Sequence, residues 1–451
     1  MAHRHASRPT RSSAPTPPLA LAGALLQRTL RFAEPPEAVL ARTLSGANRV
    51  GQRLRHALAD ALYGALRALP QVHWRWQRCL GRAPAPLDVA ALRDDAQACQ
   101  ALMALAWPTE AVPWLAQADA TSAQAVAEWQ ARAQAVSLDD APEAVRLGLP
   151  EWLVPRLQAQ VGGELPLLAA ALQAPAPVDL RVNLLKARPA QAREALQQAL
   201  GGTVSATPYA PHGLRLPGRT RLSGVPAYEQ GWVEVQDEGS QLIVALVGAR
   251  RGETVVDFCA GAGGKTLALG AEMRDSGRLY AFDTVARRLL ALPARLARAG
   301  LTNVVTMQLR DEQDERLERL AGKVDRVLVD APCTGLGTVR RHPELPWRHD
   351  PASVAQHAAL QQRIVAAAAR LVRPGGSLVY ATCSLLREEN EDVAAAFTAH
   401  HPDFALQPAA ERLAAARVPQ PQALVQGPYL RLWPHRHGCD GFFAAVWQRR
   451  G

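Results

Sequence analysis

Residues 255–266 read Val-Val-Asp-Phe-Cys-Ala-Gly-Ala-Gly-Gly-Lys-Thr, and this stretch decides the fold class of the chain. A short apolar run ends at Asp257, a glycine-rich turn follows, and Lys265 and Thr266 open a helical segment. A strand, a tight turn and a helix N-terminus together place backbone N–H groups and a partial positive charge beside a bound ligand. Glycine lets the backbone take positive φ and approach that ligand closely. The spacing matches neither the dinucleotide motif nor the phosphate loop, so this stretch alone leaves the ligand open.

Beyond this stretch, strand and helix patterns alternate, which predicts a parallel, doubly wound sheet. The expected strands are residues 254–258, 278–282, 304–308, 324–329, 377–381 and 442–447. Ligands of such sheets lie beyond the carboxyl ends of the strands. We therefore expect Asp257, Asp283, Asp330 and Cys383 to face one crevice.

Three further regions precede this sheet. Residues 1–18 are rich in Pro, Ser, Thr and Arg and are predicted to form a disordered basic tail. Residues 19–150 have apolar positions at helical spacing and predict an all-α domain. Residues 151–235 predict a linker helix and a small α+β unit, and residues 236–451 contain the sheet.

The charge balance favours an acidic partner such as nucleic acid. The 451 residues include 51 Lys or Arg and 41 Asp or Glu, a formal net charge of +10. A general basic bias of the source proteome is the alternative. Lysine occurs only at Lys186, Lys265 and Lys323. A compact ammonium beside tight glycine backbone suits a confined carboxylate, which singles out Lys265.

The six cysteines are widely spaced and include no C-x-x-C pair, which argues against a zinc site and a disulfide framework. We expect no bound metal and reduced thiols in a cytoplasmic protein. No apolar run reaches the roughly 18–20 residues of a membrane span. Cys333 and Cys383 each follow an expected strand directly, within Asp-Ala-Pro-Cys and Ala-Thr-Cys-Ser. This placement predicts a functional pair, whereas Cys259 and Cys439 are expected to pack as small apolar residues.

These segments resemble the Nop/Sun (RsmB-like) family of S-adenosylmethionine-dependent RNA cytosine-5 methyltransferases. The resemblance covers about residues 177–448, and DAPC followed by ATCS is its most specific part. The matching segments are DFCAGAGGKT (257–266), AFD (281–283), DAPCTGLGTVRRHPELPW (330–347), LVYATCSLLREENED (378–392), CDGFF (439–443), RVNLLKAR (181–188) and VQDEGSQ (235–241). Residues 53–67 resemble, more loosely, the NusB-like domain of the ribosomal-RNA members.

The resemblance implies a Rossmann-like class I methyltransferase domain with a mostly parallel seven-stranded sheet. A small α+β RNA-binding unit and an all-α RNA-binding domain would precede it. It assigns the nucleophile that adds to C6 of cytosine to Cys383 and assistance in release to Cys333. Asp330 would hydrogen-bond the cytosine edge. Lys265 would pair with the methionine carboxylate of the cofactor or lie beside the base, and the sequence leaves both roles open.

The cofactor implied by the resemblance is S-adenosylmethionine, with Asp283 on its ribose. The expected cofactor residues are Cys259, Ala260, Gly261, Ala262, Gly263, Gly264, Lys265, Asp283, Arg288, Asp311 and Asp330. Asp311 fits the acidic position after the third strand best, but Asp314 is an alternative. Ala262 stands where the family commonly has proline, which leaves the turn less pre-set. RNA contacts are expected from Arg181, Asn183, Lys186, Arg340 and Arg341.

The sequence thus predicts a monomeric RNA cytosine-C5 methyltransferase that acts on ribosomal RNA or a ribosomal subunit intermediate. A DNA cytosine-5 methyltransferase is the nearest alternative, but those enzymes place the nucleophile on the proline–cysteine loop. Here a second cysteine follows the next strand, as in the RNA enzymes. A non-catalytic ribosome-assembly factor that binds RNA is an alternative of another class, and the intact set of Cys333, Cys383, Asp330 and Lys265 argues against it.

Overall fold

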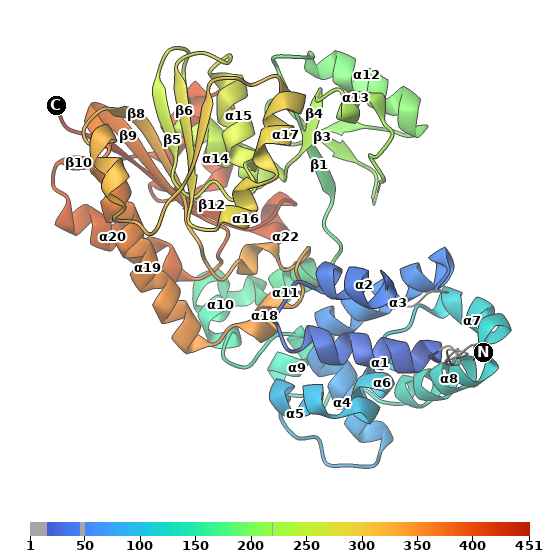
Figure 1. Cartoon of the computed structure of the whole chain (residues 1–451). Coiled ribbons are helices and arrows are strands. Elements are labelled where there is room, and N and C mark those ends of the chain that lie inside the picture. Colours follow the sequence, from blue (N-terminus) through green and yellow to red (C-terminus); the bar gives the residue numbers. More distant parts are fainter. Residues whose placement is uncertain (1–15, 46–49, 219) are drawn as a thin grey trace, which may run out of the picture. The chain divides into compact units, whose positions relative to one another are not determined.

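The computed structural model describes residues 16–45, 50–218 and 220–451 of the chain (Figure 1). It divides into two compact units, Met1–Glu151 and Trp152–Gly451. The predicted basic tail lies mostly outside the described residues, and Pro18 already begins the first helix. No helix in the described part of the chain combines the length and the apolar character needed to cross a bilayer.

In the first unit, the described residues form helices and no strands, as predicted. The helices are α1 (Pro18–Thr29), α2 (Pro36–Ser45), α3 (Gln52–Arg67), α4 (Leu69–Cys79), α5 (Val89–Asp94), α6 (Ala96–Leu105), α7 (Val112–Ala118), α8 (Ala120–Gln134) and α9 (Glu143–Leu147). Aspartates begin several of them; the Asp95 side chain, for example, accepts a hydrogen bond from the Ala98 N–H at 2.9 Å. Apolar positions at helical spacing form the core, as in α3, where Leu58, Leu62 and Leu66 recur every four residues and are fully buried.

The second unit begins with α10 (Val154–Val161) and α11 (Leu165–Gln173). A four-stranded antiparallel sheet follows, in the order β2-β3-β1-β4. Its elements are β1 (Val178–Val182), α12 (Pro189–Leu200), β2 (Ser205–Ala206), β3 (Gly213–Leu216), α13 (Pro226–Glu229) and β4 (Val233–Val235). Leu180, Leu196 and Leu214 form part of its core. This α+β region belongs to the same compact unit as the large sheet.

The large sheet has nine strands in the order β11-β12-β13-β9-β8-β5-β6-β7, with β10 paired to β13. Five adjacent strands, from β9 to the edge strand β7, are parallel: β5 (Thr254–Asp257), β6 (Arg278–Asp283), β7 (Val304–Gln308), β8 (Val324–Asp330) and β9 (Val372–Thr382). The others are antiparallel: β10 (Phe404–Gln407), β11 (Val425–Gln426), β12 (Tyr429–Leu432) and β13 (Phe442–Arg449). All six predicted strands are present. The expected total of seven was wrong because short strands extend the edge beyond β13.

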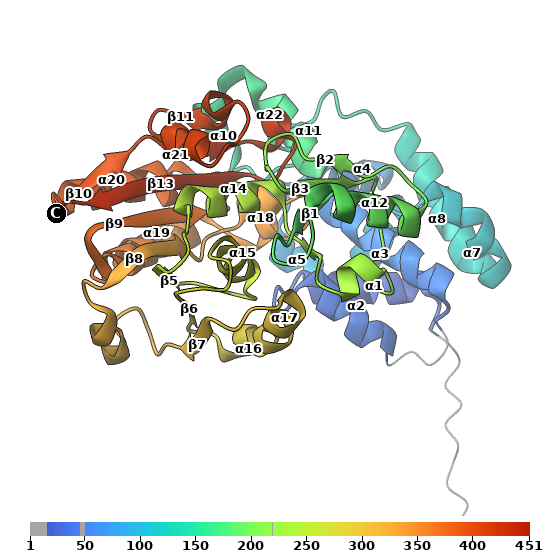
Figure 2. The same cartoon turned by 90° about the horizontal axis from the view of Figure 1, so that it is seen from above.

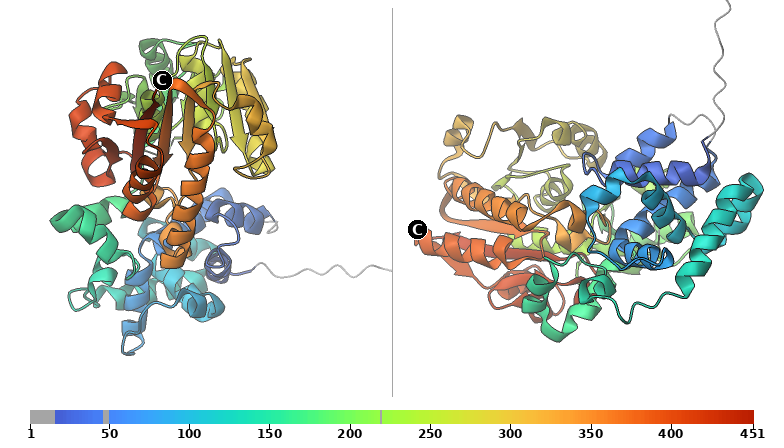
Figure 3. Two further views of the ribbon diagram at one scale, coloured as in Figure 1. Left: turned by 90° about the vertical axis from the view of Figure 1, so that its left-hand side faces the viewer. Right: turned by 90° about the horizontal axis from the view of Figure 1, so that it is seen from below.

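Helices cover both faces of this sheet (Figures 2 and 3). One core contains residues of α19 (Pro351–Ala369) and α20 (Glu391–His400), and the other contains residues of α14 (Glu238–Val247), α15 (Gly264–Glu272) and α21 (Ala409–Ala415). The remaining helices of the unit are α16 (Ala286–Leu289), α17 (Leu292–Ala299), α18 (Leu345–Arg348) and α22 (Pro434–His437). Strand β5 pairs with β6 on one side and with β8 on the other. The chain therefore adds β6 and β7 on one side of β5 and then crosses over to add β8 and β9 on the other side. Ligand crevices of doubly wound sheets open at such switch points, beyond the carboxyl ends of the strands.

Candidate active site

The glycine turn after β5 needs its glycines for two different reasons. Gly261 and Gly263 have φ of 56° and 85°, a region that favours glycine. A Cβ on Gly263 would lie 2.3 Å from the Leu292 Cδ1, so this glycine packs against α17. A Cβ on Gly261 or Gly264 would meet nothing within 4 Å, so both face open space. Helix α15 begins at Gly264, one residue before Lys265, which was predicted to open it, and its N-terminus therefore lies at the turn.

Asp283 ends β6 and fixes the turn. Its Oδ2 accepts a hydrogen bond from the Gly261 N–H at 2.9 Å, and its Oδ1 accepts one from the Val285 N–H at 2.7 Å. The Arg288 guanidinium lies 3.8 Å from the same carboxylate and is largely exposed. The predicted pair of Asp283 and Arg288 is therefore brought together beside the glycine turn.

Asp257 is fully buried beneath the turn and does not face the crevice directly. Its Oδ2 accepts a hydrogen bond from the Thr266 hydroxyl at 2.7 Å, whereas its Oδ1 has no protein partner. Burial raises the pKa of this carboxyl from 3.8 to about 7. Asp257 therefore supports the turn from below.

Lys265 and Asp330 form a close ion pair at the ends of two neighbouring elements. The Lys265 Nζ lies 2.6 Å from the Asp330 Oδ2, and their side chains are 11% and 28% exposed. The same ammonium lies 5.4 Å from the centre of the Phe442 ring, which begins β13. The attraction of Asp330 outweighs burial and raises the pKa of Lys265, so the ammonium is charged at neutral pH.

The two predicted functional thiols meet at the ends of β8 and β9. The Cys333 and Cys383 Sγ atoms are 3.5 Å apart, within sulfur hydrogen-bond distance. The hydrogen bond to Cys383 and burial hold the pKa of the Cys333 thiol well above its usual value. Cys383 lies close enough to Lys265 to contribute to the raised pKa of that ammonium. Cys259, in contrast, packs against the sheet core, and burial raises the pKa of its thiol.

Backbone hydrogen bonds lock the two cysteine loops together. The Ala331 N–H donates to the Ala381 carbonyl at 2.8 Å, and the Gly337 N–H donates to the Cys383 carbonyl at 2.7 Å. The Gly441 N–H then donates to the Gly337 carbonyl at 2.8 Å. A Cβ on Gly337 would lie 2.1 Å from the Gly441 carbonyl oxygen, so only glycine allows this approach. Sequence reasoning attached no role to Gly337, because its close neighbours are distant in the chain.

Sequence reasoning also missed Glu389, whose side chain is fully buried against both cysteine loops. A signal was available, since Glu389 lies within the family-like segment 378–392. Its adjacent glutamate, Glu388, is partly exposed and pairs with Arg156 at 3.0 Å. Composition alone does not distinguish the two.

The two candidates for the third acidic position occupy different environments. Asp314 is buried, and the Arg316 guanidinium beside it holds the pKa of its carboxyl far below the usual range. It also accepts a hydrogen bond from the Arg310 N–H at 2.9 Å. Asp311 is exposed and accepts one hydrogen bond, from the Gln313 N–H at 2.8 Å. Asp311 is thus better placed to receive a ligand, and this role stays a prediction.

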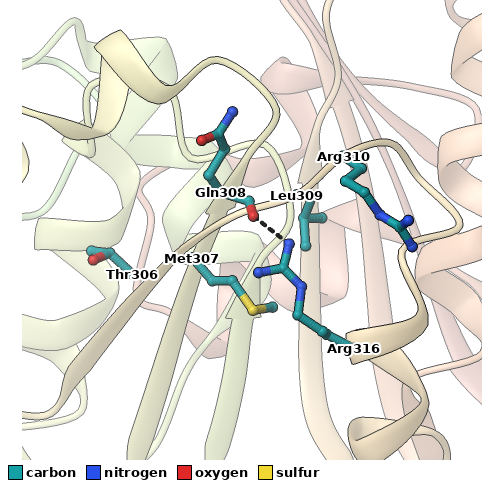
Figure 4. A pocket seen from close by; sticks show the side chains of 6 residues that line it. All are labelled: Thr306, Met307, Gln308, Leu309, Arg310 and Arg316. Atoms are coloured by element: carbon teal, nitrogen blue, oxygen red, sulfur yellow. Dashed lines mark hydrogen bonds between the residues drawn. The ribbon is translucent and has the colours of Figure 1, made fainter.

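A hollow of about 460 Å³ lies beside the edge strand β7 (Figure 4). It is lined by Thr306, Met307, Gln308, Leu309, Arg310 and Arg316. The Arg316 guanidinium donates to the Gln308 carbonyl oxygen at 2.6 Å across it. None of the lining residues belongs to the glycine turn or to the cysteine loops, so we do not assign it to the reaction.

Two residues predicted to touch RNA have other roles within the chain. Arg181 is buried and donates through Nε to the Gln236 Oε1 at 2.7 Å. Asn183 is buried and donates to the Gly231 and Ala299 carbonyls at 3.0 and 2.9 Å. Both side chains connect the α+β region to its surroundings, and their burial removes them from direct contact with RNA.

The other three predicted RNA residues also bind within the chain. Arg340 is buried and lies 3.1 Å from Asp440, and Arg341 bridges Asp440 at 2.6 Å and Asp237 at 2.9 Å. Both arginines thereby brace the segment after the proline–cysteine loop. Lys186 donates to the Gln230 and Arg298 carbonyls at 3.0 and 2.6 Å but is exposed. RNA contact remains a prediction for Lys186, whereas the buried Arg340 is structural.

The residues at the switch point fit a nucleoside cofactor with a carboxylate end. Gly261 and Gly264 leave open space at the N-terminus of α15, where backbone N–H groups favour a carboxylate. Asp283 presents a carboxylate at the end of β6, where such an oxygen can accept ribose hydroxyls. This geometry defines a class I methyltransferase that carries a pair of thiols at the end of its central strands.

Comparison with known proteins identifies the family. The family described as 16S rRNA methyltransferase RsmB/F matches residues 244–448, and the RsmF/B-like ferredoxin-like domain matches residues 149–223. The ribosomal RNA small subunit methyltransferase B of Sodalis glossinidius is 33% identical over 321 residues, which cover 70% of each chain. A Synechocystis relative named as a probable enzyme of the same kind is 36% identical and covers 67% of this chain and 68% of its own.

Solved structures agree. The crystal structure of PH0851 covers 97% of this chain and 100% of its own, with 25% identity and a TM-score of 0.73. A methyltransferase homologue from Pyrococcus horikoshii covers 68% of this chain and 97% of its own, with 28% identity and a TM-score of 0.56. The chain belongs to the RsmB/F family of 16S rRNA methyltransferases. It is an S-adenosylmethionine-dependent RNA cytosine-C5 methyltransferase, which confirms the predicted activity and cofactor and removes the DNA enzyme as an alternative.

Proposed function

We propose that this enzyme works through a covalent cysteine–cytosine adduct, with Cys383 as the nucleophile and Cys333 as its protonated partner. The observation that carries this proposal is the 3.5 Å distance between the two Sγ atoms beside the Lys265–Asp330 pair. The raised pKa of Cys333 keeps the proton on that sulfur, so Cys383 can receive its hydrogen bond as a thiolate.

Methyl transfer proceeds in three steps: addition of the thiolate, transfer of the methyl group, and elimination of the thiol. The Cys383 thiolate forms a bond to C6 of cytosine, and the electron pair of the C5–C6 double bond becomes available at C5. Bound S-adenosylmethionine supplies an electrophilic methyl group, which C5 takes while the electrons of the broken bond stay with the donor sulfur. Loss of the C5 proton to solvent restores the double bond and expels the Cys383 sulfur. The Cys333 S–H donates a hydrogen bond to that departing sulfur.

Lys265 and Asp330 hold the cytosine edge in this proposal. Asp330 accepts a hydrogen bond from the amino group or from a protonated N3, which favours charge build-up during addition. The 2.6 Å contact of Lys265 with Asp330, and its closeness to Cys383, support a place for Lys265 beside the base. Its alternative partner, the cofactor carboxylate, can instead bind the N–H groups at the start of α15.

The cofactor binds along the glycine turn. The backbone from Cys259 to Gly264 would hold its methionine end, Asp283 its ribose hydroxyls, and Asp311 its base. Arg288, 3.8 Å from Asp283, would help to orient that carboxylate. The open faces of Gly261 and Gly264 support this arrangement.

We also infer that the helical unit, residues 19–150, helps to bind RNA. Helices α4 and α8 pack together and carry a set of arginines and tryptophans near the end of α4. We name it the arginine–tryptophan face: Arg75, Trp76, Arg78, Arg82, Trp129 and Arg132. Arg82 and Arg132 lie 5.7 and 5.8 Å from the rings of Trp76 and Trp129. Among the described residues, no carboxylate forms an ion pair with these arginines, which leaves their charge for phosphate.

The small-subunit methyltransferases among the relatives support 16S ribosomal RNA as the substrate. The test uses the full-length protein, labelled S-adenosylmethionine and 16S RNA that lacks modifications. We expect Cys383→Ala to abolish methylation and Cys333→Ala to accumulate a covalent RNA adduct that survives denaturing electrophoresis. Bisulfite sequencing of the product then locates the methylated cytosine.

Cys99→Ala is the matched control, because this buried thiol lies in α6 of the helical unit, is not part of the arginine–tryptophan face, and should leave both readouts unchanged. An adduct with Cys383→Ala and none with Cys333→Ala would reverse the two roles. Methylation of free cytidine or DNA at the same rate as RNA would contradict the proposal that 16S ribosomal RNA is the substrate.

A further inference from the structure

Glu389 ends the short helical turn Arg387–Glu389 and is fully buried. Its Oε1 accepts hydrogen bonds from the Thr334 N–H at 2.9 Å and the Gln361 amide at 3.1 Å. Its Oε2 accepts from the Thr334 hydroxyl at 2.5 Å and, at close range, from the Ser384 hydroxyl. Thr334 and Ser384 are the residues that directly follow the two catalytic cysteines. One carboxylate thus holds both cysteine loops.

This carboxylate has no counter-charge in the described part of the chain, where no Lys, Arg or His forms an ion pair with it. Burial of a carboxylate is costly unless hydrogen bonds replace its water. Here all the donors are neutral groups: a backbone amide, a side-chain amide and two hydroxyls. An apolar residue would fill the same space without that cost, so the four hydrogen bonds point to a purpose other than packing.

The positions of the donors indicate that purpose. The ladder between β8 and β9 ends with the pair Asp330 and Ala381, and both cysteines lie beyond it. Gln361 also donates to the Pro332 carbonyl at 2.9 Å, so α19 is joined to the same network. Thr334 and Ser384 are fully buried, which leaves Glu389 as their common acceptor.

We propose that Glu389 is the positioning residue that sets the spacing of the two catalytic thiols by accepting hydrogen bonds from both cysteine loops at once. It touches neither base nor cofactor; it acts through Thr334 and Ser384. Among the described residues, the other direct links between the two loops are backbone hydrogen bonds at Ala331 and Gly337 and the contact of the Thr334 and Ser384 hydroxyls at 3.2 Å. Glu389 accepts from both of these hydroxyls, so we expect the 3.5 Å spacing of the thiols to depend on it. The proposal rests on the assigned roles of Cys333 and Cys383.

Two substitutions separate the charge of this side chain from its reach. Glu389→Gln keeps the size but turns one acceptor into a donor that faces other donors. Glu389→Asp keeps the charge but is too short to reach both loops. We expect each to lower kcat for RNA methylation by about 10- to 100-fold, as when a supporting hydrogen bond behind a reactive group is lost. Affinity for S-adenosylhomocysteine should stay within about twofold, since the glycine turn is untouched.

Thiol pairing reports the spacing directly and does not depend on methylation. In a glutathione buffer, Cys333 and Cys383 each give up a proton and together two electrons to oxidised glutathione, which yields an internal disulfide and two reduced glutathiones. The equilibrium constant measures the effective concentration of one thiol at the other. We expect both Glu389 variants to lower it by about tenfold or more.

Glu388→Gln is the matched control, because it makes the same change at the adjacent, partly exposed residue and should alter neither readout. A Glu389→Gln enzyme with normal thiol pairing and normal kcat would overturn the proposal, as would lost activity with unchanged pairing. If that variant fails to fold, Thr334→Val and Ser384→Ala each remove one hydroxyl donor and should each weaken pairing. Retained methylation by Cys383→Ala would instead contradict the proposed function, whatever the pairing constant.

Discussion

Asp257 couples the stability of the catalytic unit to pH. Its carboxyl is buried, receives one hydrogen bond from Thr266, and has a pKa raised by burial from 3.8 to about 7. Between these two values the folded chain holds a proton that the unfolded chain has released. The free energy of unfolding therefore falls as the pH rises through this window, and the stabilisation present at low pH is lost above about 7.

Asp257→Asn should remove this dependence. The Tm of the variant relative to the wild type should rise between pH 5.5 and pH 8, by about 2–4 °C for each kcal/mol of linkage. Differential scanning calorimetry at the two pH values measures it. Asp275→Asn is the control, because hydrogen bonds from Thr302 and Asn303 lower the pKa of Asp275 and it titrates below this range. If the Tm difference between Asp257→Asn and the wild type is the same at both pH values, Asp257 is not the group that makes the stability depend on pH.

At the scale of elements, the crossing of Gly337 and Gly441 joins the proline–cysteine loop to the start of β13. A Cβ on Gly337 would meet two backbone oxygens, those of Gly441 at 2.1 Å and Cys383 at 2.7 Å. The Cys383 oxygen is held by the hydrogen bond from the Gly337 N–H and cannot shift without breaking it. A side chain at Gly337 would therefore push the proline–cysteine loop away from Cys383 and Gly441. We expect Gly337→Ala to destabilise the protein by about 1–3 kcal/mol and to lower kcat by at least about tenfold.

Urea unfolding and methylation of 16S RNA measure these two effects. Gly163→Ala is the control, because a Cβ there meets nothing within 4 Å and φ is not positive. Wild-type activity in Gly337→Ala would mean that the loops tolerate separation and that their contact is not needed for catalysis.

The elements themselves were largely predictable. Strands such as β6 and β8 are apolar runs bounded by polar turns, and this local pattern gave all six expected strands to within a few residues. β10, β11 and β12 were missed because they are short and form by antiparallel pairing at one side of the sheet, β10 and β12 with β13 and β11 with β12. The start of α15 at Gly264 lies one residue before the expected opening at Lys265, because glycine lowers helix propensity and Gly264 was counted with the turn.

The candidate site was predictable only where a motif carried it. Cys333, Cys383, Asp330 and Lys265 were singled out from their places after strands, and the fold brings them together. The role of Arg341 was not readable, because its partners Asp237 and Asp440 lie far away in the sequence. Basic residues in a loop resemble RNA ligands until the acids beside them are known.

At the scale of the whole chain, the net charge is +10. Its effect on RNA binding depends on which arginines form ion pairs within the chain. Many are neutralised within the chain, as in the pair of Arg215 and Asp179 at 2.7 Å. The arginine–tryptophan face is different, since Arg78, Arg82 and Arg132 are exposed and have no carboxylate partner among the described residues. Unpaired arginines beside tryptophan rings suit phosphates and unstacked bases.

Replacement of these three arginines with glutamine should therefore weaken RNA binding by the full-length protein without harm to the active site. Each lost phosphate contact lowers the slope of log K against log salt by about 0.7 for single strands, so the slope should fall by about 2. Fluorescence anisotropy with 16S RNA fragments at several salt concentrations measures it, while kcat at saturating RNA should stay unchanged. The control replaces Arg31, Arg53 and Arg146, which are exposed arginines of the same unit outside this face. An equal loss of slope in both triple variants would show that net charge, and not this face, attracts the RNA, because the two variants change the charge by the same amount.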